Sequence, residues 1–351
     1  MENTKRNFQS TKEYLVGVSY FAGWWEGKAS KWIVNGEDWR DAYPNRVPLL
    51  GQSNSQDTMD KEIIAASDHG VDFFQILWYP CHNPGIDAPH AEHLNEGVKF
   101  FMASPESSRM RFCMEYCNHP PFAVSDEAIW KQTCAELISY MKHPSYLRVG
   151  GKAMFKIHSV RHFLADCGEN IEKAAAWIAY LRKLAINDGV GEIMIGAGSW
   201  TEDDFSGMPE LMAQCDYTQF YMGMPNLPQK DEDYGYDQLI GYALDEAKRC
   251  EKVSPLPFLP FVPSGWNPKP WGDDRANFAL PKRDEWTSAL AKMKILLDET
   301  PRLRIPDATP EGQKMLCIYC WNEYGEGGIV APNAGDGLTK LEAISSLFGR
   351  I

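Results

Sequence analysis

Long apolar runs and an excess of basic residues are both missing from this sequence. No run approaches the roughly 18 to 20 consecutive apolar residues that cross a bilayer, so we expect no membrane span. The 35 Lys and Arg residues are outnumbered by 48 Asp and Glu residues, which gives a formal net charge of −13. Nucleic-acid phosphates and anionic membrane surfaces attract Lys and Arg, so neither is an expected partner. A neutral or cationic substrate suits this charge better.

Several motifs that carry other chemistries are also missing. The sequence has no G-x-S-x-G around a serine nucleophile and no Walker sequence for nucleotide phosphates. His90 and His93 have the spacing of metal ligands on a helix, but no third ligand is evident. The paired-histidine motif expected at the first strand of many metal-dependent barrel hydrolases is absent as well. We therefore expect neither a metal ion nor a cofactor.

The cysteines form no disulfide framework. There are nine of them, an odd number, and several fall inside expected strands and helices, such as Cys113, Cys134 and Cys317. This distribution predicts buried free thiols. The first residues, Met1–Arg6, are polar and hold no apolar signal region, which predicts a cytoplasmic protein; a mature periplasmic or cell-surface protein whose signal peptide had been removed would look the same.

The sequence does have many short apolar runs, and apolar residues make up 44% of its 351 residues. Near-continuous apolar character is typical of strands that are covered on both faces. We predict eight strands, at Leu15–Tyr20, Val71–Trp78, Met110–Tyr116, Ala153–Ile157, Ile193–Ala197, Tyr217–Met222, Phe258–Val262 and Met315–Cys320.

A helical pattern follows each of these runs. The clearest covers Asp126–Met141 behind Ser125, a good N-cap, and its apolar residues recur on one face. A second helix is expected to start near Thr58 and to stop at Gly70. The others are predicted at Ile171–Ile186, Tyr236–Cys250, Arg283–Glu299 and Leu338–Leu347, with shorter ones at His90–Ala103 and Asp204–Gln214.

Eight alternating strands and helices predict one domain over residues 1–351, a (β/α)8 barrel with long strand-to-helix loops. The first of these loops runs from Phe21 to Gln56 and the seventh from Pro263 to Lys282, on the face where barrels carry their active sites. The alternative is a doubly wound open sheet. A phosphate-binding glycine loop after the first strand would support that alternative, and the sequence has none there. Thr300–Lys314 is a long link on the opposite face that the pattern does not explain.

The segment Trp321–Gly328 is the strongest candidate for chemistry. It places Glu323 and Glu326 three residues apart, just past the last strand, among glycines that allow sharp turns and beside an aromatic residue. Paired carboxylates are what glycosidic bond cleavage requires: one acts as a general acid with a raised pKa while the other stays ionised. The alternative is that both glutamates form surface ion pairs.

Other polar and aromatic residues end strands on the same face. Glu115 could bind sugar hydroxyls or form a salt bridge inside the rim, His158 is a plausible hydroxyl partner or an ordinary rim residue, and His119 is equally open. Indole faces stack on pyranose rings, but the tryptophans could also pack the long loops together, and both uses are expected. The candidate substrate-binding residues are Tyr20, Trp24, Trp78, Glu115, Tyr116, His158, Trp200, Tyr221, Trp266, Trp321, Asn322 and Tyr324.

The segment Trp321–Gly327 resembles the W-N-E-W-x-E-G segment of the glycoside hydrolase family 99 barrels and of the related O-antigen-biosynthesis barrels, often labelled glycosyltransferase-like. Supporting similarities lie at Gly17–Tyr20, Gly70–Phe74 and Pro263–Pro268. The sequence departs from family 99 at Tyr324 and Gly325, which replace Trp and His. It also departs at Gly328–Pro332, which lacks the T-Q-I-E-P continuation.

This resemblance implies a metal-free retaining glycoside hydrolase acting on α-linked glycans, similar to endo-α-mannosidases and mannanases, with an oligo- or polysaccharide as its partner. It implies that Glu323 takes the proton from the 2-hydroxyl of the sugar, whose oxygen attacks the anomeric carbon. Glu326 would then protonate the leaving oxygen and later activate water. The alternatives are a glycan-binding barrel without turnover and a glycosyltransferase-like protein of polysaccharide biosynthesis.

Overall fold

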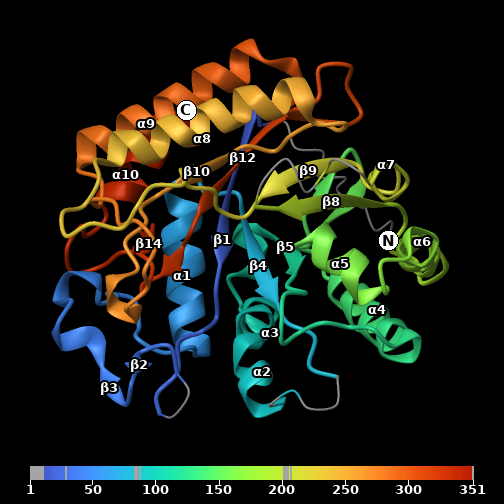
Figure 1. Cartoon of the computed structure of the whole chain (residues 1–351), viewed down its shortest axis with the longest axis horizontal. Coiled ribbons are helices and arrows are strands. Elements are labelled where there is room, and N and C mark those ends of the chain that lie inside the picture. The colour runs from blue at the N-terminus through green and yellow to red at the C-terminus, as the bar shows by residue number, and fades with distance from the viewer. Residues whose placement is uncertain are drawn as a thin grey trace, which may run out of the picture.

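The computed structural model describes residues 12–349 apart from 28–29, 83–85, 87, 201–204 and 206–207. Eight parallel strands form a nearly closed barrel with helices around it (Figure 1). The barrel strands are β1 (Tyr14–Tyr20), β4 (Phe73–Trp78), β5 (Arg111–Tyr116), β7 (Lys152–Ile157), β8 (Ile193–Ser199), β9 (Tyr217–Phe220), β10 (Phe261–Pro263) and β12 (Gln313–Tyr319). The predicted (β/α)8 architecture is therefore confirmed.

Closure of the barrel depends on one weak seam. Hydrogen-bonded pairing runs without a break from β10 through β12, β1, β4, β5, β7 and β8 to β9. Between β9 and the chain leading into β10 there is a single parallel bridge, Thr218 to Phe258, in which the Leu259 amide donates to the Thr218 carbonyl at 2.8 Å. The seventh strand is consequently shorter than the predicted Phe258–Val262 and begins later.

The helices lie on the outside of the barrel, with α8 and α9 side by side along the top of Figure 1. They are α1 (Gln56–Asp68), α2 (Ala88–Leu94), α3 (Glu96–Ala103), α4 (Glu127–Met141), α5 (Val160–Asp166), α6 (Ile171–Asn187), α7 (Pro209–Met212), α8 (Tyr236–Val253), α9 (Arg283–Glu299) and α10 (Thr339–Phe348). Short 3-10 turns lie at Trp39–Asp41, Pro44–Arg46, Ser107–Arg109, Lys269–Trp271 and Pro301–Leu303.

Three of the helix predictions need correction. The N-cap of α4 is Asp126 and not Ser125, because the Asp126 carboxylate accepts hydrogen bonds from the amides of Ala128 and Ile129. The predicted helix His90–Ala103 is two helices, α2 and α3. Of the predicted Asp204–Gln214 helix, Asp204 lies outside the described residues, as does the polar start Met1–Arg6, and the helical part is α7.

Additional short strands extend the barrel at both ends. At the carboxyl ends of the barrel strands lie two separate two-stranded sheets, β2 (Ile33–Val34) with β3 (Glu37–Asp38) and β13 (Asn322–Glu323) with β14 (Gly328–Ile329). At the opposite end, β6 (Arg148–Val149) pairs with β7 and β11 (Arg304–Ile305) with β12, both antiparallel. The unexplained link Thr300–Lys314 is thus accounted for, because it contributes an added strand to the barrel wall.

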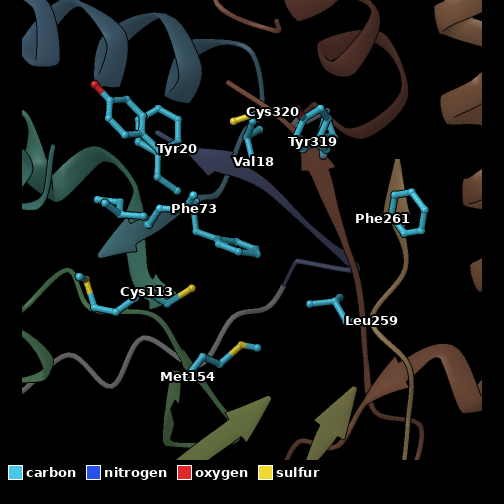
Figure 2. Close-up of a cluster of buried hydrophobic side chains, with 14 of the residues drawn as sticks. Val18, Tyr20, Phe73, Cys113, Met154, Leu259, Phe261, Tyr319 and Cys320 are labelled. Atoms are coloured by element: carbon cyan, nitrogen blue, oxygen red, sulfur yellow. The ribbon is translucent and has the colours of Figure 1, made fainter. Parts of the chain in front are cut away.

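The barrel interior is apolar toward the amino ends of its strands. Phe73, Cys113, Met154 and Leu259 meet there, as Figure 2 shows. A methyl group built on Gly17 would lie 2.1 Å from the Phe73 ring, so this ring fills space that only a glycine on β1 leaves open. All nine cysteines are free, and all but Cys81 are buried, as the sequence predicts.

No helix in the described part of the chain is both long and apolar enough to cross a membrane.

Candidate active site

Both glutamates of the strongest sequence motif lie on one hairpin at the carboxyl end of the barrel. Glu323 ends β13 and is paired with Gly328 of β14. The turn between them is closed by the Glu326 and Gly327 amides, which donate to the Glu323 carbonyl at 3.1 and 2.9 Å. Gly327 has a φ of 81°, a left-handed conformation that favours glycine. The turn therefore fixes where Glu326 stands relative to Glu323.

Glu323 is 5% exposed, and its two carboxylate oxygens differ in their surroundings. Oε1 accepts a hydrogen bond from the Tyr221 hydroxyl at 3.1 Å. Oε2 is buried and has no hydrogen-bond partner among the described residues. Burial raises the pKa of Glu323 to about 7, although the Tyr221 hydroxyl and the charge of Lys31 act to lower it. A buried oxygen without a partner costs free energy, and a hydroxyl group of a ligand would satisfy it.

Glu326 is partly exposed, and the Tyr319 hydroxyl donates a hydrogen bond to its Oε2. Removal from bulk water raises its pKa to about 7; Arg275 and Lys31 oppose this rise and Asp273 adds to it. Near neutral pH each glutamate is thus present in both protonation states, which is the range in which a general acid or base works best.

The two tyrosines that hold the glutamates also contact each other. The rings of Tyr221 and Tyr319 are 5.1 Å apart between centroids and perpendicular. Tyr221 follows β9 and Tyr319 ends β12, so the barrel wall itself sets the relative position of the two tyrosine–glutamate pairs.

A buried ion-pair cluster lies inside the barrel beside this site. Glu115 is fully buried, with the Lys156 ammonium at 2.8 Å and His158 Nδ1 at 2.6 Å from its Oε1. The Gln75 amide donates to its other oxygen at 2.5 Å. Burial alone would raise the pKa of Glu115, but Lys156 and His158 outweigh burial and lower it to about 2. Of the two roles left open for Glu115, the structure supports the internal salt bridge.

The ion-pair cluster reaches the glutamates through aromatic contacts. The Lys156 ammonium lies 5.7 Å from the centre of the Tyr221 ring. The His158 ring lies 5.2 Å from both Tyr221 and Trp200. Trp200 is 37% exposed, whereas His158 is 5% exposed. The structure thus brings His158, Trp200 and Tyr221 together at the rim with Glu323.

The two long loops add charged and aromatic groups. In the first loop, Lys31 lies 5.3 Å above the Trp271 ring of the seventh loop. In the seventh loop, the Arg275 guanidinium lies 4.5 Å above the Trp266 ring and forms an ion pair with Asp273. Trp266 in turn lies 6.1 Å from Tyr319. Of these residues, Lys31, Asp273 and Arg275 act on Glu326 through their charges.

Four predicted sugar-binding aromatics face the helices instead. The Tyr20 hydroxyl donates to Glu62 of α1 at 2.8 Å, and in Figure 2 its ring extends away from Phe73 toward the neighbouring helix. Trp78 and Tyr116 are wholly buried and pack against Tyr140 and Trp130 of α4, respectively. Trp321 is wholly buried and packs against Phe74, 5.1 Å away. We therefore withdraw Tyr20, Trp78, Tyr116 and Trp321 as substrate contacts.

Three further candidates support the loops. Tyr324 stacks on Trp32 at 5.5 Å and contacts Trp24 at 5.0 Å, and all three are buried. The Asn322 side-chain oxygen accepts a hydrogen bond from the Phe21 amide at 2.8 Å. Trp24, Asn322 and Tyr324 thus join the first loop to the hairpin, the packing role foreseen for part of the tryptophans.

Sequence reasoning missed several residues around the site, namely Lys31, Arg46, Gln75, Lys156, Arg275 and Tyr319. A usable signal existed for three of them. Gln75 and Lys156 interrupt apolar strands that are otherwise continuous, and a polar side chain in such a strand needs a buried partner. Tyr319 sits two residues past Cys317 on β12, so strand alternation places it on the interior side.

No family model matches the chain. Two curated relatives, each named uncharacterized protein WxcX and each from a strain of Xanthomonas campestris pv. campestris, are 24% identical over 220 residues. The match covers 62% of this chain, which spans only about 30% of the length of these relatives.

Solved structures match over nearly the whole chain. A protein described as glycoside hydrolase-like superposes with a TM-score of 0.64 at 14% identity, covering 98% of this chain and 96% of that one. The family 99 endo-α-mannosidase from Bacteroides thetaiotaomicron gives 0.58 at 13% identity, covering 95% and 97%. An exo-β-1,4-mannosidase from Opitutaceae bacterium strain TAV5 gives 0.52 at 13% identity, covering 95% and 58%. The chain thus has the barrel fold of these glycoside hydrolases.

Proposed function

We propose that this protein is a retaining glycoside hydrolase acting on α-linked glycans, with Glu323 and Glu326 as its catalytic pair in a single (β/α)8 domain. One observation carries the proposal: two glutamates on one hairpin, each held by a tyrosine of the barrel wall, both have a pKa near 7, and one carboxylate oxygen of Glu323 has no partner among the described residues.

The roles follow from the surroundings of each carboxyl group. Glu323 Oε2 is available to take the proton from the 2-hydroxyl of a bound sugar while Tyr221 holds Oε1. The 2-oxygen then attacks the anomeric carbon and displaces the leaving oxygen, which receives the proton of Glu326. Water attacks the resulting 1,2-anhydro sugar as Glu326 takes its proton, and Glu323 returns a proton to the 2-oxygen. Two inversions leave the configuration retained, and every proton is returned.

The experiment is a screen of α-mannans and other α-glycans, with the configuration of the product followed by proton NMR. We expect hydrolysis with retention. Glu323→Gln and Glu326→Gln should each reduce turnover by at least roughly a hundredfold, the contribution of a positioned acid or base.

The matched control is Glu62→Gln. Glu62 is equally buried and burial also raises its pKa to about 7, but it lies on α1 and accepts its hydrogen bond from Tyr20. This variant should keep its turnover. Full activity of either Glu323→Gln or Glu326→Gln would refute the role assigned to that residue. Glycan binding without turnover would identify a binding barrel, and transfer that depends on a nucleotide sugar would identify a glycosyltransferase.

A further inference from the structure

Arg46, in the first long loop, is a buried cation with an unusual set of partners. It is 5% exposed, and the hydrogen bonds that its guanidinium makes within the described part of the chain all go to neutral oxygens. One nitrogen donates to the carbonyls of Asn267 at 2.8 Å, Tyr324 at 3.1 Å and Gly325 at 3.4 Å, and the other to the Asn267 side-chain oxygen at 2.8 Å. No carboxylate among the described residues lies within ion-pair distance of it.

Burying a charge in this way is costly unless its hydrogen bonds are well made. Burial lowers the pKa of Arg46 to about 10, although Tyr43 and Asp233 act in the opposite direction. The group therefore stays charged at neutral pH. Arg46 stays charged despite the desolvation cost, and it donates hydrogen bonds to main-chain carbonyls. This combination indicates that the backbone carrying these carbonyls is held in one conformation.

That segment is the turn that carries the acid/base. The Tyr324 and Gly325 carbonyls lie between Glu323 and Glu326 in sequence. Asn267 accepts two of the four hydrogen bonds that Arg46 donates. The backbone N–H of Asn267 also donates a hydrogen bond to the Glu326 carbonyl at 2.5 Å. Arg46 thus holds the turn directly and again through Asn267, so it connects the first, seventh and eighth loops.

A second buried cation holds the far strand of the same hairpin. Lys340 of α10 is 3% exposed and donates to the Ile329 carbonyl at 2.7 Å, with Asp336 at 3.3 Å. Ile329 pairs with Asn322 in β14 and β13. Arg46 therefore restrains the turn of a hairpin whose base is already fixed.

We propose that Arg46 is the positioning residue for Glu326: its fork of hydrogen bonds to the turn sets the place of the Glu326 carboxyl group and makes that placement depend on docking of the first loop. This inference rests on the proposed function for its kinetic consequences. Its structural consequence can be measured without any substrate.

The first test is a carbon-13 NMR titration of the glutamate carboxyl groups in the intact protein, with Glu326→Gln used to assign the signal. In Arg46→Lys and Arg46→Gln the turn should loosen, and Glu326 should move toward water. The pKa of Glu326 should then fall by about one pH unit or more toward its ordinary value. The pKa of Glu323, whose carboxylate is held by Tyr221, should change little. Tyr319, Arg275, Asp273 and Lys31, the groups that face Glu326, are untouched by these substitutions.

The matched control is Arg40→Gln, in the same loop. Arg40 pairs with Asp38 and Glu26 and lies 4.9 Å above the Trp32 ring, and among the described residues none of its hydrogen bonds or ion pairs reaches the hairpin. It should leave both glutamate titrations unchanged. An unchanged Glu326 pKa in folded Arg46→Lys, or an equal shift at Glu323, would overturn the proposal.

The second test is kinetic. Arg46→Ala should lower kcat at least tenfold with KM changed less than about threefold, because a misplaced acid weakens the transition state more than substrate binding. Added guanidinium ion at low millimolar concentration should restore part of kcat in Arg46→Ala but not in Arg40→Ala. If folded Arg46→Ala loses kcat and guanidinium ion does not restore it, the result would argue against a role of Arg46 in positioning Glu326. If the wild-type protein hydrolyses no glycan, the proposed function fails, whereas the NMR titration still decides the role of Arg46.

Discussion

At the scale of single residues, the buried pair Glu115–Lys156 shows how the barrel keeps charge inside an apolar wall. Both side chains are fully buried, and Lys156 Nζ lies 2.8 Å from Glu115 Oε1. Such a pair seldom adds much to stability over apolar residues of the same size, but removing one partner strands a buried charge. The Lys156 ammonium matters for the site because it also lies beneath the Tyr221 ring.

Lys156→Met should therefore lower the free energy of unfolding by about 3 to 5 kcal/mol, as measured by urea denaturation. The control is Lys152→Met on the same strand, whose ion pair with Glu192 is largely exposed and should contribute about 1 kcal/mol or less. Adding Glu115→Gln to Lys156→Met should recover most of the loss. If the double variant is no more stable than Lys156→Met, the stranded charge is not the cause.

At the scale of elements, strand alternation decides which predicted residues reach the site. The sequence located all eight strands and the segment after the last strand that holds the two glutamates, because apolar runs and glycine-flanked carboxylates are local signals; that this segment forms a hairpin is seen only in the structure. It did not assign the faces of the strands. On β5, Glu115 points inward and Tyr116, one residue later, packs against α4. A strand end alone therefore does not identify a substrate contact.

The contacts between loops could not be predicted either. Lys31, Arg46 and Trp271 come from loops whose conformations depend on one another, so no local pattern in the sequence places them near Glu326. Gln75 and Lys156 were within reach, because each interrupts an apolar strand. Tyr221 is among the predicted substrate-binding residues and stays a prediction, but no local pattern indicates its hydrogen bond to Glu323.

The seventh and eighth loops meet at a glycine, and this contact can be tested. A methyl group on Gly325 would lie 2.1 Å from the Trp271 ring. Gly325→Ala should therefore displace Trp271, and if this indole contacts substrate, KM should rise roughly tenfold, about 1.4 kcal/mol of binding. In a Trp271→Ala background the glycine substitution should add no further effect.

The matched control for this substitution is Gly241→Ala on α8, where no atom lies within 4 Å of the added methyl group. It should leave KM unchanged and stabilise the protein by about 0.5 to 1 kcal/mol. A tenfold rise in KM that persists when Gly325→Ala is added to Trp271→Ala would show that the glycine acts through something other than the indole.

At the scale of the whole molecule, four buried or partly buried carboxyl groups give the fold a dependence on pH. Burial raises the pKa of Glu62, Asp166, Glu323 and Glu326 to about 7. The folded protein therefore holds protons that the unfolded chain has released, so unfolding releases protons between about pH 5 and 7. The free energy of unfolding must fall as pH rises through this range and level off above it.

Two other sets of groups do not reverse this expectation. Lys156 and His158 hold the pKa of Glu115 at about 2, so its contribution is lost only as pH falls below about 4.5. Burial lowers the pKa of His119 and His143, which favours the folded state as pH rises through about 6.5. The pKa shifts of the two histidines are modest, whereas the pKa of each of the four carboxyl groups lies far above its ordinary value. The carboxyl groups should therefore dominate the pH dependence of the free energy of unfolding.

Urea denaturation at pH 5, 6, 7 and 8 should therefore show the highest stability at pH 5. Glu323 alone accounts for up to about 3 kcal/mol of the fall, because its pKa of about 7 compares with 4.5 in the unfolded chain. The double variant Glu62→Gln/Glu323→Gln cannot ionise at these positions. Its free energy of unfolding should therefore depend much less on pH, while its stability at pH 7 should be kept. Stability that rises from pH 5 to 7 in the wild-type protein would mean that these carboxyl groups are ionised in the fold, and an acid role for Glu326 near neutral pH would then lose its physical basis.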